Sequence, residues 1–232
     1  MATLTARSIV DKAKIIVQDN TGVRWPDVEL IKWLNDAQRD VVLMKPDACV
    51  KNVSVQAVAG TKQTLPNDAI GLIDVPRNMG VNGTTPGRTI RQIPKVVLDG
   101  LTADWHTATA SAVSLHYVYD KRDPKHFYLY PPQPAVGPGQ IEVVYPANPV
   151  DCTLASHDGL STGSPDSVIA IDDVYGGALL DLVLYRAYSK DSKYAGDGSR
   201  AVAHRTAALE TLGVKEQAEV GHEPVAVTNR AE

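Results

Sequence analysis

The sequence of 232 residues predicts an α+β protein in which helices from both ends form one bundle and the middle forms an inserted, antiparallel β-rich lobe. Apolar residues recur at helical spacing in residues 1–49 and again in residues 168–213, whereas residues 50–167 alternate like strands between long loops. Helices at opposite ends of a chain can bury their apolar faces only against each other. The chain must therefore close back on itself.

Two helices are expected in the N-terminal part. Ser8 and Asp11 form a capping pair at the start of the first, which residues 19–22 (Asp-Asn-Thr-Gly) stop. Pro26 suits the first position of the second helix because it has no N–H to satisfy, and acidic residues follow it where the helix dipole is positive. Residues 45–46 (Lys-Pro) end this helix.

The first half of the middle region predicts strands and a loop. Residues 50–57 alternate apolar and polar side chains, and residues 63–65 can pair back on them as a hairpin. Residues 72–75 predict another strand, ended by a proline. Residues 78–87 contain several Gly, Pro and Asn residues, a composition typical of a mobile surface loop.

The second half of the middle region begins with a short helical turn after Pro94, anchored at its end by Trp105. Three strands are predicted at residues 113–119, 126–130 and 141–145. Because their connections are short, we expect antiparallel pairing between them.

The C-terminal part predicts two more helices and a tail. Asp172 or Asp173 caps the first, whose broad apolar side leads into glycines at residues 196–199. The second is expected to end at Gly213. Residues 214–232 carry too little apolar surface to order by themselves and predict an extended C-terminal arm.

The charge, cysteine content and hydropathy of the chain limit the kinds of partner that it can bind. The formal net charge is −4, which disfavours tight nucleic-acid binding but allows a duplex to slide past without sequence-specific contacts. Cys49 and Cys152 lie far apart without metal-ligand spacing, so we expect reduced thiols and neither a disulfide framework nor a zinc site. No apolar run reaches the ~20 residues of a spanning helix, so no membrane partner is expected.

Arg186 lies in the middle of an otherwise apolar helical segment. A half-buried guanidinium requires partners, and its fork geometry suits a carboxylate. We expect an intramolecular tie to Asp36 or Asp40 of the second helix, in preference to a role at an interface.

Two patterns match catalytic or metal sites only formally. Ser161 lies in a Gly-x-Ser-x-Gly pattern, but no apolar strand precedes it and Pro165 follows where a helix should start, so we expect no catalytic residue. Side chains that could ligate a metal recur in the second half of the middle region, at His116, Asp120, Asp123 and His126. Strand and turn positions explain them more simply. We expect neither a metal nor a cofactor.

Three segments occur in an order and spacing that is informative as a set. They are Trp-Leu-Asn-Asp-Ala-Gln-Arg-Asp at residues 33–40, Phe-Tyr-Leu-Tyr-Pro-Pro at residues 127–132 and Leu-Tyr-Arg-Ala-Tyr at residues 184–188. Through them the chain resembles, from about Arg24 to about Gly213, the head-to-tail connector (adaptor) proteins of tailed bacteriophages, of the podovirus type that binds a portal. Pro26 departs from the hydroxyl or acidic cap that this family often has after the Trp.

The resemblance implies a structural protein and not an enzyme. It implies a homo-oligomeric ring, usually twelvefold, that lies below the portal protein at the head-tail junction of the virion, meets a tail or nozzle protein and surrounds the DNA channel. Such a protein is synthesised in the host cytoplasm. We expect the C-terminal arm to engage the portal through a small apolar cluster: Val220, Pro224, Val225 and Val227.

An alternative stays open from the sequence. A tail-associated binding protein could recognise a carbohydrate or another host-surface ligand through aromatic side chains on exposed strand faces. The aromatic residues that favour this alternative are Tyr117, Tyr119, Tyr128 and Tyr130.

Overall fold

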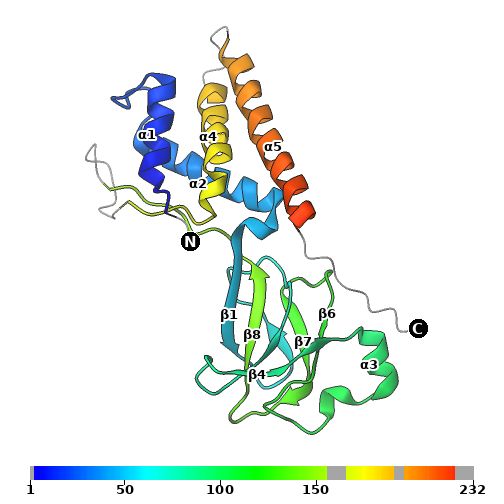
Figure 1. Cartoon of the computed structure of the whole chain (residues 1–232). Coiled ribbons are helices and arrows are strands. Elements are labelled where there is room, and N and C mark those ends of the chain that lie inside the picture. The colour runs from blue at the N-terminus through cyan, green and yellow to red at the C-terminus, as the bar shows by residue number, and fades with distance from the viewer. Residues whose placement is uncertain (1–2, 156–165, 191–195, 223–232) are drawn as a thin grey trace. The chain divides into compact units, whose positions relative to one another are not determined.

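The computed structural model describes residues 3–155, 166–190 and 196–222, the last nine of these for the backbone only. It is an α+β structure with helices at both ends of the chain and strands in the middle, which confirms the predicted fold class (Figure 1). The chain divides into two compact units. Residues 1–43 and 149–232 make the helical unit, and residues 44–148 make the β unit.

Within the described ranges, the helical unit contains four α-helices: α1 (Ala6–Val17), α2 (Asp27–Met44), α4 (Gly176–Lys190) and α5 (Asp197–His222). Helix α4 packs against both α1 and α5, so these two flank it (Figure 1). A short 3₁₀ helix, η3 (Asp173–Tyr175), leads into α4. Large apolar side chains are fully buried here, among them Ile9, Leu30, Leu34, Ile169, Ile171, Leu179 and Leu184.

The starts of α1 and α2 differ from the prediction by one turn and by one residue. Thr5 caps α1, because its Oγ1 accepts a hydrogen bond from Ser8 N at 3.2 Å; the predicted Ser8 cap is therefore wrong. Ser8 has the position three residues after the cap, so its N–H needs that acceptor. The carbonyl of Pro26 accepts from Glu29 N and Leu30 N, which makes Pro26 the residue just before α2.

The C-terminal helices also correct two predictions. Neither Asp172 nor Asp173 caps a helix N-terminus with its side chain, since the carboxylate of Asp173 binds the N-terminal segment instead. Helix α5 continues beyond Gly213 to His222. A glycine costs a helix only about 1 kcal/mol relative to alanine, and the residues that follow include Lys, Glu, Gln and Ala, which are strong helix formers. The predicted end at Gly213 is wrong for this reason.

Two four-stranded sheets build the β unit. One has the order β1-β8-β3-β4 and the other β2-β7-β6-β5. The strands are β1 (Val50–Gln56), β2 (Gly60–Thr64), β3 (Arg77–Met79), β4 (Pro86–Thr89), β5 (Arg91–Gln92), β6 (His116–Tyr119), β7 (His126–Gln133) and β8 (Gln140–Pro146). The apolar side chains of β7 and β8 that are buried include Phe127, Leu129, Ile141, Val143 and Tyr145.

The predicted hairpin after β1 is wrong, because β1 pairs with β8 whereas β2 pairs with β7. The chain turns a corner between the two sheets at Gly60, which has a φ of +88°. The side-chain amide of Gln63 holds the corner by accepting from Val58 N at 2.7 Å and donating to Val58 O at 2.9 Å. Similarly, β6 and β7 pair antiparallel as predicted, but β7 and β8 lie in different sheets.

The predicted strand at residues 72–75 makes only one bridge to β8, between Asp74 and Val144. Pro76 has no N–H for the ladder, which resumes at Asn78 in β3. Residues 78–87, predicted as a mobile loop, contain parts of the paired strands β3 and β4. Their glycines serve the turn between these strands, where Gly83 has a φ of +67°.

Helix α3 (Lys95–Leu101) is the predicted helical turn, and Trp105 anchors its end as expected. Trp105 is 1% exposed and packs with Leu98 and Val118. Its indole Nε1 donates to Asp99 Oδ1 at 2.8 Å, so the polar edge of the buried ring is satisfied.

Candidate functional site

Two amide side chains of α2 fix the chain where it continues beyond the β unit. Asn35 Oδ1 accepts from Cys152 N at 2.7 Å, and Asn35 Nδ2 donates to Cys152 O at 3.2 Å. Gln38 Oε1 accepts from Ala170 N at 2.7 Å. Both amides are buried, where a lost partner would leave an unsatisfied backbone group at about 1–3 kcal/mol. The segment at residues 33–40 therefore holds the helical unit together across long sequence separations.

Arg186 of α4 lies against the two carboxylates expected for it on α2. Its Nη2 is 2.7 Å from Asp40 Oδ2, and its Nη1 is 3.6 Å from Asp36 Oδ2. The Arg186 side chain is 29% exposed, and Nε is buried without a partner in the described part of the chain. Partly solvated ion pairs contribute at most about 1 kcal/mol, so this tie orients α2 against α4 more than it stabilises them.

A buried ion cluster joins α1 to the start of α2. The Asp27 carboxylate pairs with Lys14, and its Oδ2 lies 2.6 Å from Arg7 Nη1. Burial acts to raise the pKa of Asp27, but hydrogen bonds and charges from Lys14 and Arg7 outweigh it, so its pKa lies below the usual value. Sequence spacing does not predict this cluster, because Arg7 and Lys14 belong to α1 whereas Asp27 belongs to α2.

Asp19 organises the loop between α1 and α2. Its carboxylate accepts from three successive backbone N–H groups, at Val23, Arg24 and Trp25, over 2.7–3.1 Å. Burial acts to raise the pKa of Asp19, and these hydrogen bonds lower it to a net value below the usual one. The loop thereby places Trp25 in the core, where its Nε1 donates to Ala187 O of α4 at 3.2 Å.

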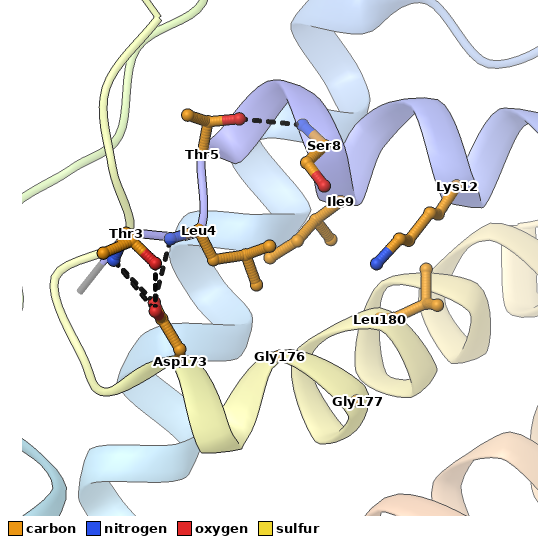
Figure 2. Close-up of a pocket in the computed structure, with 10 residues that line it drawn as sticks. All are labelled: Thr3, Leu4, Thr5, Ser8, Ile9, Lys12, Asp173, Gly176, Gly177 and Leu180. Carbon is orange, nitrogen blue, oxygen red and sulfur yellow. Dashed lines mark hydrogen bonds between the residues drawn. The ribbon is translucent and has the colours of Figure 1, made fainter.

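The N-terminal segment is fastened beside η3 (Figure 2). The carboxylate of Asp173 accepts from Thr3 N at 2.8 Å, from Thr3 Oγ1 at 2.6 Å and from Leu4 N at 2.9 Å. The Thr3 hydroxyl is the main cause that lowers the pKa of Asp173, with the two backbone N–H groups adding to it. Thr5 pairs with Val168 in a single antiparallel bridge.

A groove of about 430 Å³ lies between the first half of α1 and the start of α4, and Figure 2 shows the residues that line it. Leu4, Ile9 and Leu180 supply its apolar lining, and the ammonium group of Lys12 lies at one end. Its remaining lining consists of the N-terminal segment, Ser8, Asp173 and the glycine pair Gly176 and Gly177.

Gly176 and Gly177 differ in the space that their surroundings leave for a side chain. A Cβ on Gly176 would lie 2.6 Å from Leu4 Cδ2, so the fastening of the N-terminal segment explains that glycine. A Cβ on Gly177 would meet no atom of the described residues within 4 Å. Packing among those residues therefore does not require a glycine at this position.

The residues expected to contact a portal fall at the end of the chain. Val220 lies in the last part of α5, where only the backbone is described. Pro224, Val225 and Val227 lie outside the described residues, as do Ser161 and residues 156–158.

The residues considered as metal ligands make other contacts. His126 Nδ1 lies 2.8 Å from Asp123 Oδ1, and Asp120 binds Arg122. The ring of His116 stacks on Tyr130 with 6.4 Å between centroids. In the part of the chain that the structure describes, no three His, Cys, Asp or Glu side chains are grouped so that they could hold a metal ion.

The tyrosines considered for carbohydrate binding have partners inside the β unit. Tyr117 is 3% exposed and its hydroxyl donates to Asp74 Oδ1 at 2.8 Å. Tyr119 accepts from Leu72 N at 3.1 Å, and Tyr128 packs edge-on against Trp105. With Tyr130 stacked on His116, each of the four rings has a partner within the β unit.

The fold places helices from both ends of the chain in one unit, as the spacing of apolar residues predicts. The sequence model of the SU10 adaptor protein family matches residues 4–228. The chain belongs to the SU10 adaptor protein family. Its members are phage adaptors, so this adaptor is a structural phage protein and a virion component. A search of curated protein sequences finds no match. None of the described helices of the adaptor is long and apolar enough to span a membrane.

Proposed function

We propose that this adaptor assembles into a closed ring, twelvefold as in the connectors it resembles, below the portal of a phage capsid. There it joins the capsid to a tail or nozzle protein and surrounds the DNA channel. The observation that carries the proposal is the family match over residues 4–228, nearly the whole chain. Its action is geometric: each copy presents surfaces that order its neighbours, and no bond-making chemistry is required.

Two separate surfaces of the helical unit support a ring in which helical units contact one another. A ring with head-to-tail contacts needs two different surfaces on each copy, because residue i of one copy meets residue j of the next. The helical unit presents a groove between α1 and α4, and a different outer face on α5, on the other side of α4. The hydrogen bonds and ion pairs inside the helical unit keep these two surfaces in a fixed relation.

The charge of the chain supports passage of DNA without tight binding. With 23 basic and 27 acidic residues, the chain lacks the excess of cations that phosphate neutralisation requires. A channel wall of mixed sign lets a duplex slide.

We place the portal contact at the C-terminal end of the chain, through Val220, Pro224, Val225 and Val227. Deleting residues 214–232 is expected to leave the unit folded, because Ala201, Ala208 and Leu212 provide the buried contacts of α5 and remain present. The shortened protein should no longer assemble on portal. Deleting only residues 223–232 separates the end of the arm from the helical part that contains Val220. Unchanged assembly of both variants would contradict the placement.

The proposed function is tested by mixing the purified adaptor with purified portal and examining the mixture by negative-stain electron microscopy. We expect an additional ring of density on one end of the portal, with the symmetry given by class averages. Sedimentation of adaptor alone measures whether it is monomeric before it meets the portal. An adaptor that neither binds portal nor forms rings would contradict the proposal.

A further inference from the structure

We propose that the groove between α1 and α4 receives helix α5 of a neighbouring copy, and that this is the contact that repeats around the ring. The inference rests on the proposed ring and adds to it the two surfaces that join the copies. On the receiving copy the surface is the groove lined by Leu4, Ile9, Lys12, Gly177 and Leu180. On the inserting copy it is the outer stripe of α5, defined next.

The outer stripe of α5 consists of Val202, Thr206 and Leu209, at spacings of four and three residues that place them on one side of the helix. Val202 is 65% exposed and Leu209 is 45% exposed. The Thr206 hydroxyl donates to Val202 O at 3.0 Å, so its polar group is already satisfied and its methyl group remains for packing. This stripe is therefore an apolar surface on a helix otherwise rich in polar residues.

The stripe cannot be covered by the helix that α5 already packs against. The side of α5 that faces α4 consists of Ala201, Ala208 and Leu212, all buried. Val202 and Leu209 lie next to these residues in sequence but on a different side of the helix. Since α1 and α5 flank α4, the stripe and the groove of one copy are separate surfaces, and a contact between them must join different copies (Figure 1).

Gly177 leaves room in the groove for another backbone to approach closely. A glycine within a helix costs about 0.5–1 kcal/mol relative to alanine, and no atom of the described residues lies within 4 Å of the place where a Cβ would be. A helix that packs in the groove would use this space, because small residues let helix axes approach to the near end of the usual 8–10 Å range. The missing side chain is then explained by the neighbour.

Charge complementarity selects α5 as the occupant. Lys12 lies at one end of the groove, and Glu210 follows the last residue of the stripe. Both side chains are exposed, and across the described ranges neither forms an ion pair or a hydrogen bond within its own chain. When α5 of one copy lies in the groove of the next, Glu210 can meet Lys12. The contact is head-to-tail, which closes into a ring when it repeats.

Charge reversal tests the pairing. Lys12→Glu and Glu210→Lys should each weaken ring assembly on portal at least about tenfold, because each places like charges together. The double variant K12E/E210K should return assembly close to that of the unchanged protein, since it restores opposite charges. Lys62→Glu, an exposed lysine on β2, is the matched control and should assemble normally. Sedimentation velocity and negative-stain images of the full-length protein with portal measure assembly.

A glycine pair tests the close approach independently. Gly177→Leu should leave the isolated adaptor about as stable as before, because leucine is a better helix former and its Cβ meets no described atom within 4 Å, yet it should block ring assembly. Gly100→Leu in α3 also places its Cβ in open space and should assemble normally. Melting temperature by circular dichroism confirms that both variants are folded.

The outcomes separate this inference from the proposed function. If the unchanged adaptor forms rings on portal and the K12E, E210K and G177L variants do so equally well, the groove is not the contact while the ring remains. Failure of K12E/E210K to recover, with both single variants impaired, would likewise overturn the pairing. If the unchanged adaptor forms no ring, the proposed function itself is wrong.

Discussion

The two units of the molecule are held together in different ways. The β unit uses one continuous stretch, residues 44–148, whereas the helical unit uses two stretches separated by that whole insert. Backbone pairing between strands connects most of the β unit, but side chains of α2 such as Asn35, Gln38 and Asp27 connect the helical unit. In the helical unit, whose two stretches are separated in sequence by the β unit, hydrogen bonds and ion pairs between side chains therefore take the place of backbone pairing between strands. We expect the helical unit to depend more strongly on single polar residues.

The largest expected difference between the two units is whether a fragment from each folds on its own. A fragment of residues 44–148 should fold on its own, because both sheets and their core lie within it. A fragment of residues 1–43 should not, since its helices would expose residues that α4 buries. Circular dichroism and the dispersion of amide NMR signals measure both. An unfolded 44–148 fragment would show that the β unit depends on the helical unit.

Within the helical unit, Asp27→Asn should lower the free energy of unfolding by about 3–5 kcal/mol, because it leaves the charges of Arg7 and Lys14 buried without their carboxylate. Urea denaturation followed by tryptophan fluorescence measures the change. Asp11→Asn, an exposed position on the same helix as Arg7, serves as the control and should alter stability by less than about 0.5 kcal/mol. Equal effects of the two substitutions would contradict the buried cluster.

In the β unit, Gly139→Ala should cost about 3 kcal/mol, because the added Cβ would lie 1.9 Å from Ala112 O and the backbone must move. Gly100→Ala, with open space at the same position, should be neutral or slightly stabilising. Hydrogen exchange resolved by residue should place the loss in residues 44–148. Equal loss in the helical unit would show that the two units unfold together.

The stability of the helical unit should depend on pH in the acid range. The pKa values of Asp19 and Asp27 lie below their usual values in the folded helical unit, whereas an unfolded Asp titrates near ~3.9. Their stabilisation is therefore complete above pH ~4 and is lost as the pH falls through the folded pKa values. Asp27→Asn should show a shallower loss below pH ~4. An unchanged acid slope would exclude this carboxylate as a cause.

The smallest effect is expected at Arg186. Arg186→Met should lower stability by about 1 kcal/mol or less, since its ion pairs with Asp36 and Asp40 are partly solvated. Raising the salt concentration should reduce the difference from the unchanged protein. A loss above about 3 kcal/mol would mean that the pair behaves as a buried one.

Much of the secondary structure could be predicted from the local sequence. The helices around α1, α2 and α4, the anchoring of α3 by Trp105 and the strands β6, β7 and β8 follow from the spacing of apolar residues. The end of α5 could not, because one glycine resembles a stop signal wherever it occurs. The groove also could not, because residues 3–12 and 173–180 line it together and are separated by the β unit.

The sequence by itself determined the α+β class, most helices and strands, and through three short segments the resemblance to phage head-to-tail adaptors. Those properties depend on neighbouring residues, whose periodicity sets which face of an element is apolar. The tertiary structure alone decided that β1 and β2 enter different sheets, that Asp173 binds Thr3, and that Gly177 opens onto a groove. Each of these depends on which groups far apart in the sequence come together in the fold. The local sequence around a hydrogen-bonding group does not show which distant group it will pair with.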